Sequence, residues 1–180
     1  MLKEADACIS ATKPGPGVIK KEWVEGMADD AVLFACANPI PEILPEDAKD
    51  AGVRVVGTGR SDYPNQVNNS LGFPAVFRGA LEFGASDITD EMCIEGAYTL
   101  AQRAEEIGLS EDFVMPVTGD QEAYVKEAVS FVEKAIEQGV ARIKMSTEEL
   151  QNKVRLKLKS YRETTQILMD EGIIPPFPEE

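Results

Sequence analysis

Short apolar runs separated by polar, Gly- and Pro-rich loops dominate the first third of the chain. Three of these runs have the length and composition of β-strands, at residues 6–11, 31–37 and 53–56. The second run, AVLFACA, is continuously apolar and therefore predicts a strand covered on both faces. Helices are expected between the runs, at residues 20–28 and from Pro45 to Gly52. This alternation predicts a parallel βαβαβ unit.

Helical periodicity dominates from residue 67 onward. It predicts helices over residues 68–83, 87–107, 119–139 and 146 to about 171. Pro74 lies inside the first of these and is expected to kink or interrupt it. The last helix opens with a capping-box pattern at residues 146–149. The predicted fold class is α/β: half of a doubly wound, Rossmann-like parallel sheet of three strands, followed by a helical carboxyl-terminal region.

A cluster of side-chain amides follows the third strand. Residues 55–69, VVGTGRSDYPNQVNN, lead from strand through loop into helix, and the amides are Asn65, Gln66, Asn68 and Asn69. Ligands of open α/β sheets bind at the carboxyl ends of the strands. An amide offers donors and an acceptor without a charge, so it suits a carboxylate or a carboxamide. Structural roles stay open as well, since an asparagine pair is also a good helix N-cap and Asn38-Pro39 a common turn opener.

Composition narrows the possible chemistry. The 180 residues include no histidine, which excludes Ser-His and Cys-His nucleophiles and the commonest transition-metal ligand. The formal net charge of −14 argues against nucleic acid or an anionic membrane as partner. Neither a bilayer-spanning apolar run nor a signal-peptide pattern is found, so a cytoplasmic location is expected. Of three cysteines without CxxC spacing, Cys8 and Cys36 are expected to be buried, inert thiols.

Three motifs in order carry a family resemblance: TKPGPG at residues 12–17, FACANPIPE at 34–42 and TGRSDYPNQVNN at 58–69, with EQGVARI following at 137–143. Together they resemble the carboxyl-terminal part of the small, prokaryotic-type malic enzyme, an oxidoreductase that oxidises malate with a nicotinamide cofactor and decarboxylates it to pyruvate. The resemblance implies that residues 1–145 are the carboxyl-terminal half of an NAD(P)-binding domain and residues 146–180 a final helix with a loose tail. It leaves the cofactor as NAD or NADP.

The resemblance also implies roles for single residues. Asn38, Asn68 and Asn69 match substrate-binding asparagines, and Asn38 and Asn68 also match contacts to the nicotinamide end of the cofactor. Thr12 and Lys13 match a cofactor-binding segment near the nicotinamide ribose. Neutral amides of this kind can orient carboxylate and carboxamide groups for hydride transfer. For Arg60 and Asp62, in the amide-rich loop, a local ion pair is at least as good an expectation as cofactor contact.

The sequence also departs from the family pattern. It contains no G-x-G-x-x-G turn, and the family's general-base lysine, acid tyrosine and carboxylate ligands for Mg or Mn are expected upstream of these residues. Without that upstream part, the strand at residues 6–11 would be an apolar edge strand with one side unpaired. We therefore expect a truncated or split malic enzyme that needs an amino-terminal malic enzyme fragment, or self-association, for catalysis. The alternatives are a non-catalytic nucleotide- or dicarboxylate-binding module and an interaction or remnant protein.

Overall fold

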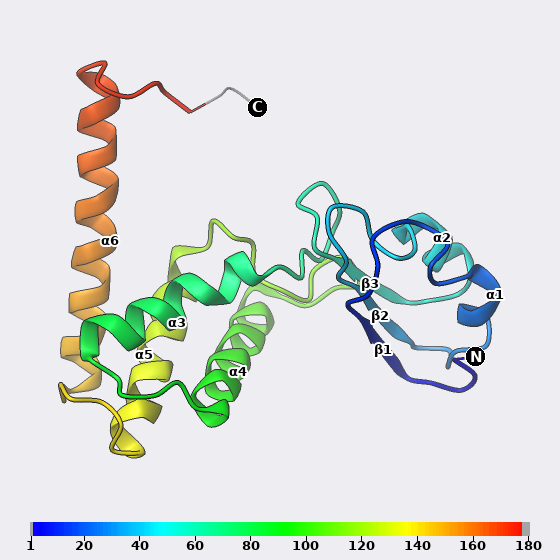
Figure 1. Cartoon of the computed structure of the whole chain (residues 1–180), viewed down its shortest axis with the longest axis horizontal. Coiled ribbons are helices and arrows are strands. Elements are labelled where there is room, and N and C mark those ends of the chain that lie inside the picture. Colours follow the sequence, from blue (N-terminus) through cyan, green and yellow to red (C-terminus); the bar gives the residue numbers. More distant parts are fainter. Residues whose placement is uncertain (1, 178–180) are drawn as a thin grey trace.

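The computed structural model describes residues 2–177, which form two lobes joined by a narrow waist (Figure 1). The first lobe contains β1 (Ala7–Ser10), α1 (Lys21–Val24), β2 (Val32–Ala35), α2 (Pro45–Asp50) and β3 (Val55–Thr58). The second lobe contains α3 (Asn69–Phe83), α4 (Asp90–Ile107), α5 (Gln121–Glu137) and α6 (Thr147–Asp170). The predicted order of strands and helices is thus confirmed.

The sheet is parallel throughout, with the strand order β1-β2-β3. Ile9 of β1 lies beside Phe34 of β2, which lies beside Gly57 of β3. In the doubly wound order 3-2-1-4-5-6, the last three strands are neighbours in the same way. The structure therefore confirms the α/β, Rossmann-like fold class.

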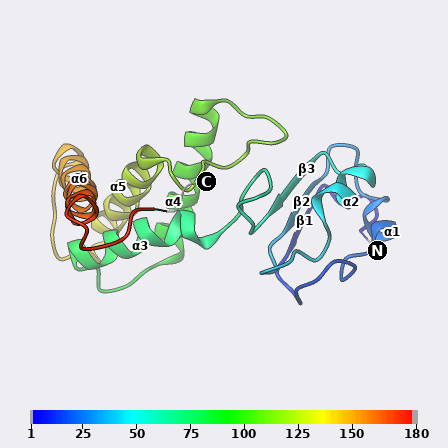
Figure 2. The same cartoon turned by 90° about the horizontal axis from the view of Figure 1, so that it is seen from above.

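The two faces of this sheet differ in burial. Leu33 and Val56 are fully buried in a core shared with α1 and α2, and Figure 2 shows both helices on one side of the sheet. On the other face Phe34 is half buried and Ile9 is 76% exposed. The expectation that β2 is covered on both faces is wrong for the described residues, because helices pack against only one of its faces.

Several elements differ from the predicted bounds, and for two of them the hydrogen bonds give the reason. The helix expected over residues 20–28 is reduced to α1, because the chain turns at Gly26, whose carbonyl accepts the Glu4 N–H at 2.6 Å. The third strand begins two residues later than expected. Val53 is held to the end of α2 by an N–H bond to the Ala48 carbonyl at 3.1 Å, so it cannot join the sheet ladder.

Helix α5 is the centre of the helical lobe and packs against α3, α4 and α6. Its side chains Val125, Val129 and Phe131 are buried. Helix α3 approaches it closely because Gly79 lies under the Phe131 ring, where a Cβ atom would be only 2.7 Å from a ring carbon. Asp120 caps the start of α5 by accepting two backbone N–H bonds.

Pro74 lies within α3, which nevertheless continues unbroken from Asn69 to Phe83. Of the two expected effects, an interruption is therefore wrong, and a kink at Pro74 stays a prediction. Proline removes the N–H that would bond to the carbonyl four residues earlier, here that of Ser70. The Tyr124 hydroxyl of α5 donates to this carbonyl at 3.0 Å and replaces the lost bond.

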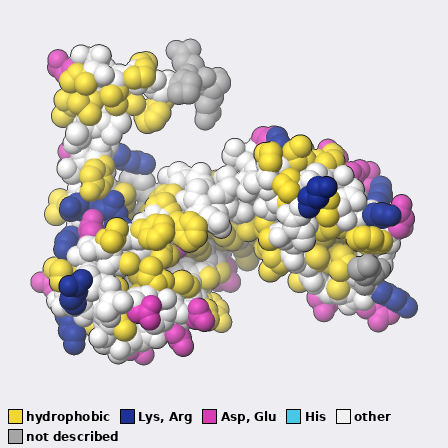
Figure 3. All heavy atoms as spheres, viewed as in Figure 1, with side chains coloured by type: hydrophobic (Ala, Val, Ile, Leu, Met, Phe, Trp, Pro, Cys, Tyr) yellow, Lys and Arg dark blue, Asp and Glu magenta, His cyan; other side chains and the backbone are white. Residues whose placement is uncertain are grey.

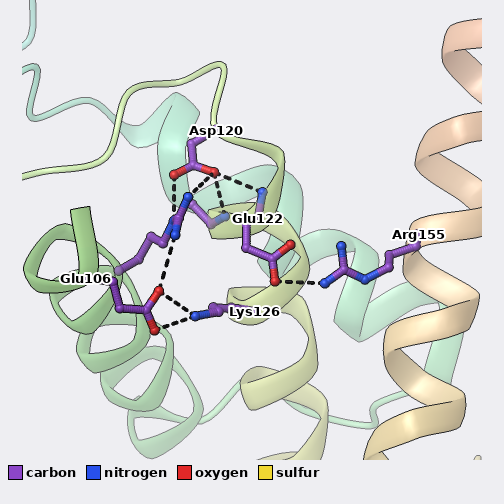
Figure 4. A network of polar contacts seen from close by, with 7 residues as sticks. Glu106, Asp120, Glu122, Lys126 and Arg155 are labelled. Atoms are coloured by element: carbon purple, nitrogen blue, oxygen red, sulfur yellow. Dashed lines mark hydrogen bonds and ion pairs between the residues drawn. The ribbon is translucent and has the colours of Figure 1, made fainter.

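Helix α6 begins at the predicted capping box, with reciprocal bonds between Ser146 and Glu149. Only its first half packs on the lobe, through the buried Leu150 and Val154, while its second half projects away (Figure 1). Ion pairs join the helices of this lobe (Figure 4): Arg103–Asp120 at 2.8 Å and Lys126–Glu106 at 2.5 Å between α4 and the start of α5, and Arg155–Glu122 at 2.7 Å between α6 and α5. The division of the chain at residue 145 stays a prediction.

Within residues 2–177 no helix has the length and apolar character needed to cross a membrane.

Candidate functional site

The loops that follow β1 and β2 are joined by one buried carboxylate, that of Glu42. Its side chain is 0% exposed. One oxygen accepts the Ser10 hydroxyl at 2.7 Å and the Thr12 N–H at 2.7 Å, and the other accepts the Ala37 N–H at 3.1 Å. Glu42 therefore fixes Thr12, which follows β1, relative to the residue just before Asn38, which follows β2.

The hydrogen bonds also decide the charge of Glu42. Burial by itself raises the pKa of this carboxyl, but the bonds from Ser10, Thr12 and Ala37 together outweigh burial, and the pKa lies below its ordinary value. Glu42 is therefore an anion at neutral pH. Burial, and then the Glu42 charge, raise the pKa of the half-buried Cys8 and Cys36 thiols. Both stay protonated and therefore poorly nucleophilic.

Gly59 brings the loop after β2 together with the start of α3. A Cβ atom at Gly59 would lie 2.9 Å from both terminal atoms of the Asn38 amide, so glycine is what allows this close approach. On its other side, the Gly59 carbonyl accepts a hydrogen bond from Asn68 Nδ2 at 2.8 Å. The structure thus brings Asn38 and Asn68 together around one backbone segment at the carboxyl edge of the sheet.

The clustered amides after β3 have different surroundings. Asn65 is buried and its side chain bonds to Val56, Glu111 and Val114. Asn68 is the N-cap of α3, because its Oδ1 accepts the Ser70 N–H at 3.0 Å. The amide of Asn65 is thus bonded within the fold, whereas Asn68 caps α3 and lies half buried at the edge of the sheet.

The other candidate residues lie on the same loops but are less engaged. Thr12, Lys13, Asn38 and Asn69 are all exposed. Within residues 2–177 no hydrogen bond joins the side chains of Lys13, Asn38 or Asn69 to another group. Arg60 and Asp62 form the expected local ion pair at 2.5 Å, and Arg60 also donates to the Pro39 carbonyl at 3.3 Å. Arg60 therefore adds a second connection between the loops after β2 and β3.

Sequence reasoning missed two residues that organise this site, Glu42 and Gly59. Both lie inside the motifs FACANPIPE and TGRSDYPNQVNN, yet neither looks unusual there. A glutamate beside prolines is ordinarily exposed, and the glycine is one of several in the loop. Only their distant partners reveal their roles.

We expect Gly59→Ala to displace the Asn38 amide while changing the free energy of unfolding by less than about 1 kcal/mol. Asn38 is exposed and its side chain can rotate away from the new methyl group, so the stability of the fold should change little. The side-chain amide resonances of Asn38 in ¹⁵N-labelled protein should shift, while those of Asn65 stay. Gly57→Ala is a useful contrast, because its Cβ would meet Phe34, Val67 and the Asn65 carbonyl and should destabilise the sheet itself.

This strand order, with polar loops at the carboxyl edge of the sheet, is typical of α/β domains that bind nucleotides. Residues 19–136 match the family described as "Malic enzyme, NAD binding domain". The chain belongs to this family.

Relatives and solved structures agree with this assignment. The bifunctional malic/malolactic enzyme of Bacillus subtilis is 46% identical over 155 residues, which are 86% of this chain and 37% of that protein. The NADP-dependent malic enzyme of Halomonas elongata is 38% identical over 71% of this chain and 34% of that protein. The crystal structure of Entamoeba histolytica malic enzyme superposes with a TM-score of 0.94 and 42% identity, over 98% of this chain and 37% of that one. The chain thus spans little more than a third of the length of these proteins.

The residues present fit one part of the chemistry that the family implies. The open amide of Asn38 beside Gly59 suits the carboxamide of a nicotinamide. For a metal ion the fit is poor, because the described part of the chain holds no group of three Cys, Asp or Glu side chains able to ligate one.

Proposed function

We propose that this chain is the carboxyl-terminal part of the NAD(P)-binding domain of a malic enzyme and supplies one wall of the site that binds malate and nicotinamide. Its role is to hold and orient the two ligands. The general base, the general acid and the metal ligands belong to the remaining part of the enzyme, on the same or another polypeptide. The observation that carries the proposal is the meeting of Asn38 and Asn68 around Gly59 in a member of this family.

The chemistry of the edge supports this role. Asn38 has all of its amide hydrogen-bonding capacity available, and Asn69 lies in the first turn of α3. No acidic residue occupies that turn, so the positive end of the helix dipole favours a carboxylate there. Thr12 and Lys13 lie on the loop that Glu42 fixes next to the Asn38 loop, within the same edge. We assign Asn38, Asn68 and Asn69 to malate, and Thr12, Lys13, Asn38 and Asn68 to the cofactor.

Two exposed apolar surfaces are evidence that another protein segment packs against this chain. Within residues 2–177, β2 is the only strand that pairs with β1, so the other edge of β1 is unpaired, and Ile9 is exposed on the face of the sheet without helices. On α3, Phe73, Phe77 and Leu81 form an exposed stripe, and hydrophobic side chains gather over this helix in Figure 3. An unpaired edge and an apolar stripe are surfaces that proteins normally cover. We propose that the amino-terminal part of a malic enzyme, or a second copy of this chain, covers them.

A reducing, cytoplasmic location fits the three free thiols of Cys8, Cys36 and Cys93. We therefore propose that the protein is cytoplasmic.

The test is malate-dependent reduction of NAD or NADP in the presence of Mn²⁺, with this chain alone and with the amino-terminal part of a family member added. We expect turnover only in the mixture. Asn38→Ala in the mixture should lower kcat/KM about tenfold to a hundredfold, since an orienting contact is lost at the reacting end of the substrate. Asn152→Ala, which removes an exposed asparagine of α6 in the other lobe, is the matched control and should leave the rate unchanged.

Each outcome decides between functions. Turnover by the chain alone would show that it contains the acid, base and metal ligands that we assign elsewhere. Absence of turnover in the mixture, with malate binding detected by calorimetry and abolished by Asn38→Ala, would replace the enzyme with a binding module. Absence of both would favour an interaction or remnant protein.

A further inference from the structure

A buried carboxyl lies at the centre of the helical lobe, away from the site described above. Glu127 of α5 is 2% exposed, and its fully buried Oε2 has no hydrogen-bond partner among the residues that the structure describes. It lies between two glycines, Gly72 of α3 and Gly96 of α4. A Cβ atom at these positions would be 3.3 Å and 3.5 Å, respectively, from Glu127 Oε1. The carboxyl therefore fills the space that the glycines leave where three helices meet.

Within residues 2–177 no charged side chain forms an ion pair with Glu127. Burial raises the pKa of Glu127 to about 8, so the carboxyl is protonated at neutral pH. Lys126, its neighbour on α5, extends to Glu106 instead (Figure 4). Charged groups on the surrounding helices are paired elsewhere: Glu95 with Lys134, Arg103 with Asp120, Arg78 with Glu82, and Arg155 with Glu122. The titratable group that does interact with Glu127 is Tyr124, whose own pKa is raised by burial and by the Glu127 charge.

Glu127 and Tyr124 lie one turn apart on α5 and both contact the first turns of α3. Glu127 contacts Gly72, and the Tyr124 hydroxyl donates to the Ser70 carbonyl, the carbonyl that Pro74 leaves without its helical partner. The N–H of the same Ser70 bonds to the Asn68 side chain at 3.0 Å. The setting of Asn68 therefore depends on how α3 packs against this part of α5.

We propose that Glu127 is a buried acid whose protonation holds the first turn of α3 against α4 and α5, and that it thereby positions Asn68 and Asn69. A protonated carboxyl fits the apolar space between the glycines. An ionised one must draw in water or a cation, and both require α3 and α5 to separate. The effect on ligand binding rests on the proposed function, whereas the effect on helix packing does not.

The direction of the pH effect follows from linkage. Because the folded chain retains this proton up to about pH 8 and an unfolded glutamate loses it near pH 4.5, the stabilisation is complete below pH 4.5 and is lost as the pH rises to 8. Above pH 8 the folded chain carries the buried charge. Glu127→Gln keeps the shape of the side chain without the ionisation, so the comparison of the two proteins isolates this one group.

The first measurement is unfolding of the 180-residue chain by urea at pH 5.5 and pH 8. We expect the unfolding equilibrium constant of the wild type, relative to that of Glu127→Gln, to rise at least tenfold between these pH values. Glu105→Gln, an exposed glutamate on α4, is the control and should follow the wild type. Glu127→Leu should resemble Glu127→Gln in its pH dependence, which keeps the test valid if the amide variant folds poorly.

The second measurement is amide hydrogen exchange of residues 66–73, compared between wild type and Glu127→Gln at the same pH so that intrinsic rates cancel. We expect the protection of the wild type, relative to that of Glu127→Gln, to fall between pH 6 and pH 9. An unchanged protection ratio would overturn the positioning role, and an unchanged ratio of the unfolding constants would overturn the buried acid itself. Neither readout requires a ligand, so failure of this inference and failure of the proposed function are distinguishable.

Discussion

Glu42→Ala is expected to lower the free energy of unfolding by about 3–5 kcal/mol, because it removes the shared acceptor of several buried donors. The Ser10 hydroxyl and the Ala37 N–H would lose their partner in a buried site, and the Thr12 N–H would lose its partner in a partly buried one. Urea unfolding at pH 7, followed by circular dichroism, measures the loss. A change below about 1 kcal/mol would mean that water or another group satisfies these donors.

Two further variants separate the charge of Glu42 from its shape. Glu42→Gln keeps one acceptor but turns an NH₂ group toward a donor, so it should be nearly as damaging. Glu46→Ala, in the exposed first turn of α2, should cost less than about 1 kcal/mol. Because the pKa of Glu42 is lowered in the folded chain, its stabilisation is present above pH 4.5 and is lost as the pH falls through the folded pKa. The wild type should therefore lose stability in acid faster than Glu42→Ala does.

Local signals were sufficient for most of the fold. Apolar runs bounded by loops identified the three strands, and Pro45 and Ser146 correctly indicated the starts of α2 and α6. Where the prediction failed, a residue far away in the sequence had replaced a local interaction. Pro74 does not interrupt α3 because Tyr124, fifty residues later, satisfies the carbonyl that the proline leaves free.

The site was predicted less completely than the fold, for a related reason. The amide cluster at residues 65–69 shows that hydrogen-bonding groups gather after β3, but each amide is a chemically equivalent candidate in the sequence. Their distant partners distinguish them. Asn65 is enclosed by residues from β3 and from the segment after α4, Asn68 caps a helix, and Asn69 is exposed. The sequence offered no means of separating a structural amide from one available to a ligand.

Asn65→Ala is the variant for which this distinction has the largest consequence, and we expect it to destabilise the chain by about 3–4 kcal/mol. Its Nδ2 donates to the carbonyls of Val56 at 3.0 Å and Glu111 at 2.7 Å, and its Oδ1 accepts the Val114 N–H at 2.9 Å. The residue is 6% exposed and has φ of +54°, a left-handed conformation that alanine tolerates poorly. These bonds attach the segment after α4 to the sheet lobe.

Two controls divide this loss into its causes. Asn65→Gly accepts the left-handed backbone, so it should recover about 1 kcal/mol relative to Asn65→Ala, and what remains is the cost of the lost hydrogen bonds. Asn69→Ala, four residues later and exposed, should change the free energy of unfolding by less than about 0.5 kcal/mol. Urea unfolding gives all three values, and hydrogen exchange over residues 109–116 should increase in both Asn65 variants only. If Asn65→Gly were as stable as the wild type, backbone strain alone would account for the residue, and the connection between the lobes would have to lie in other contacts.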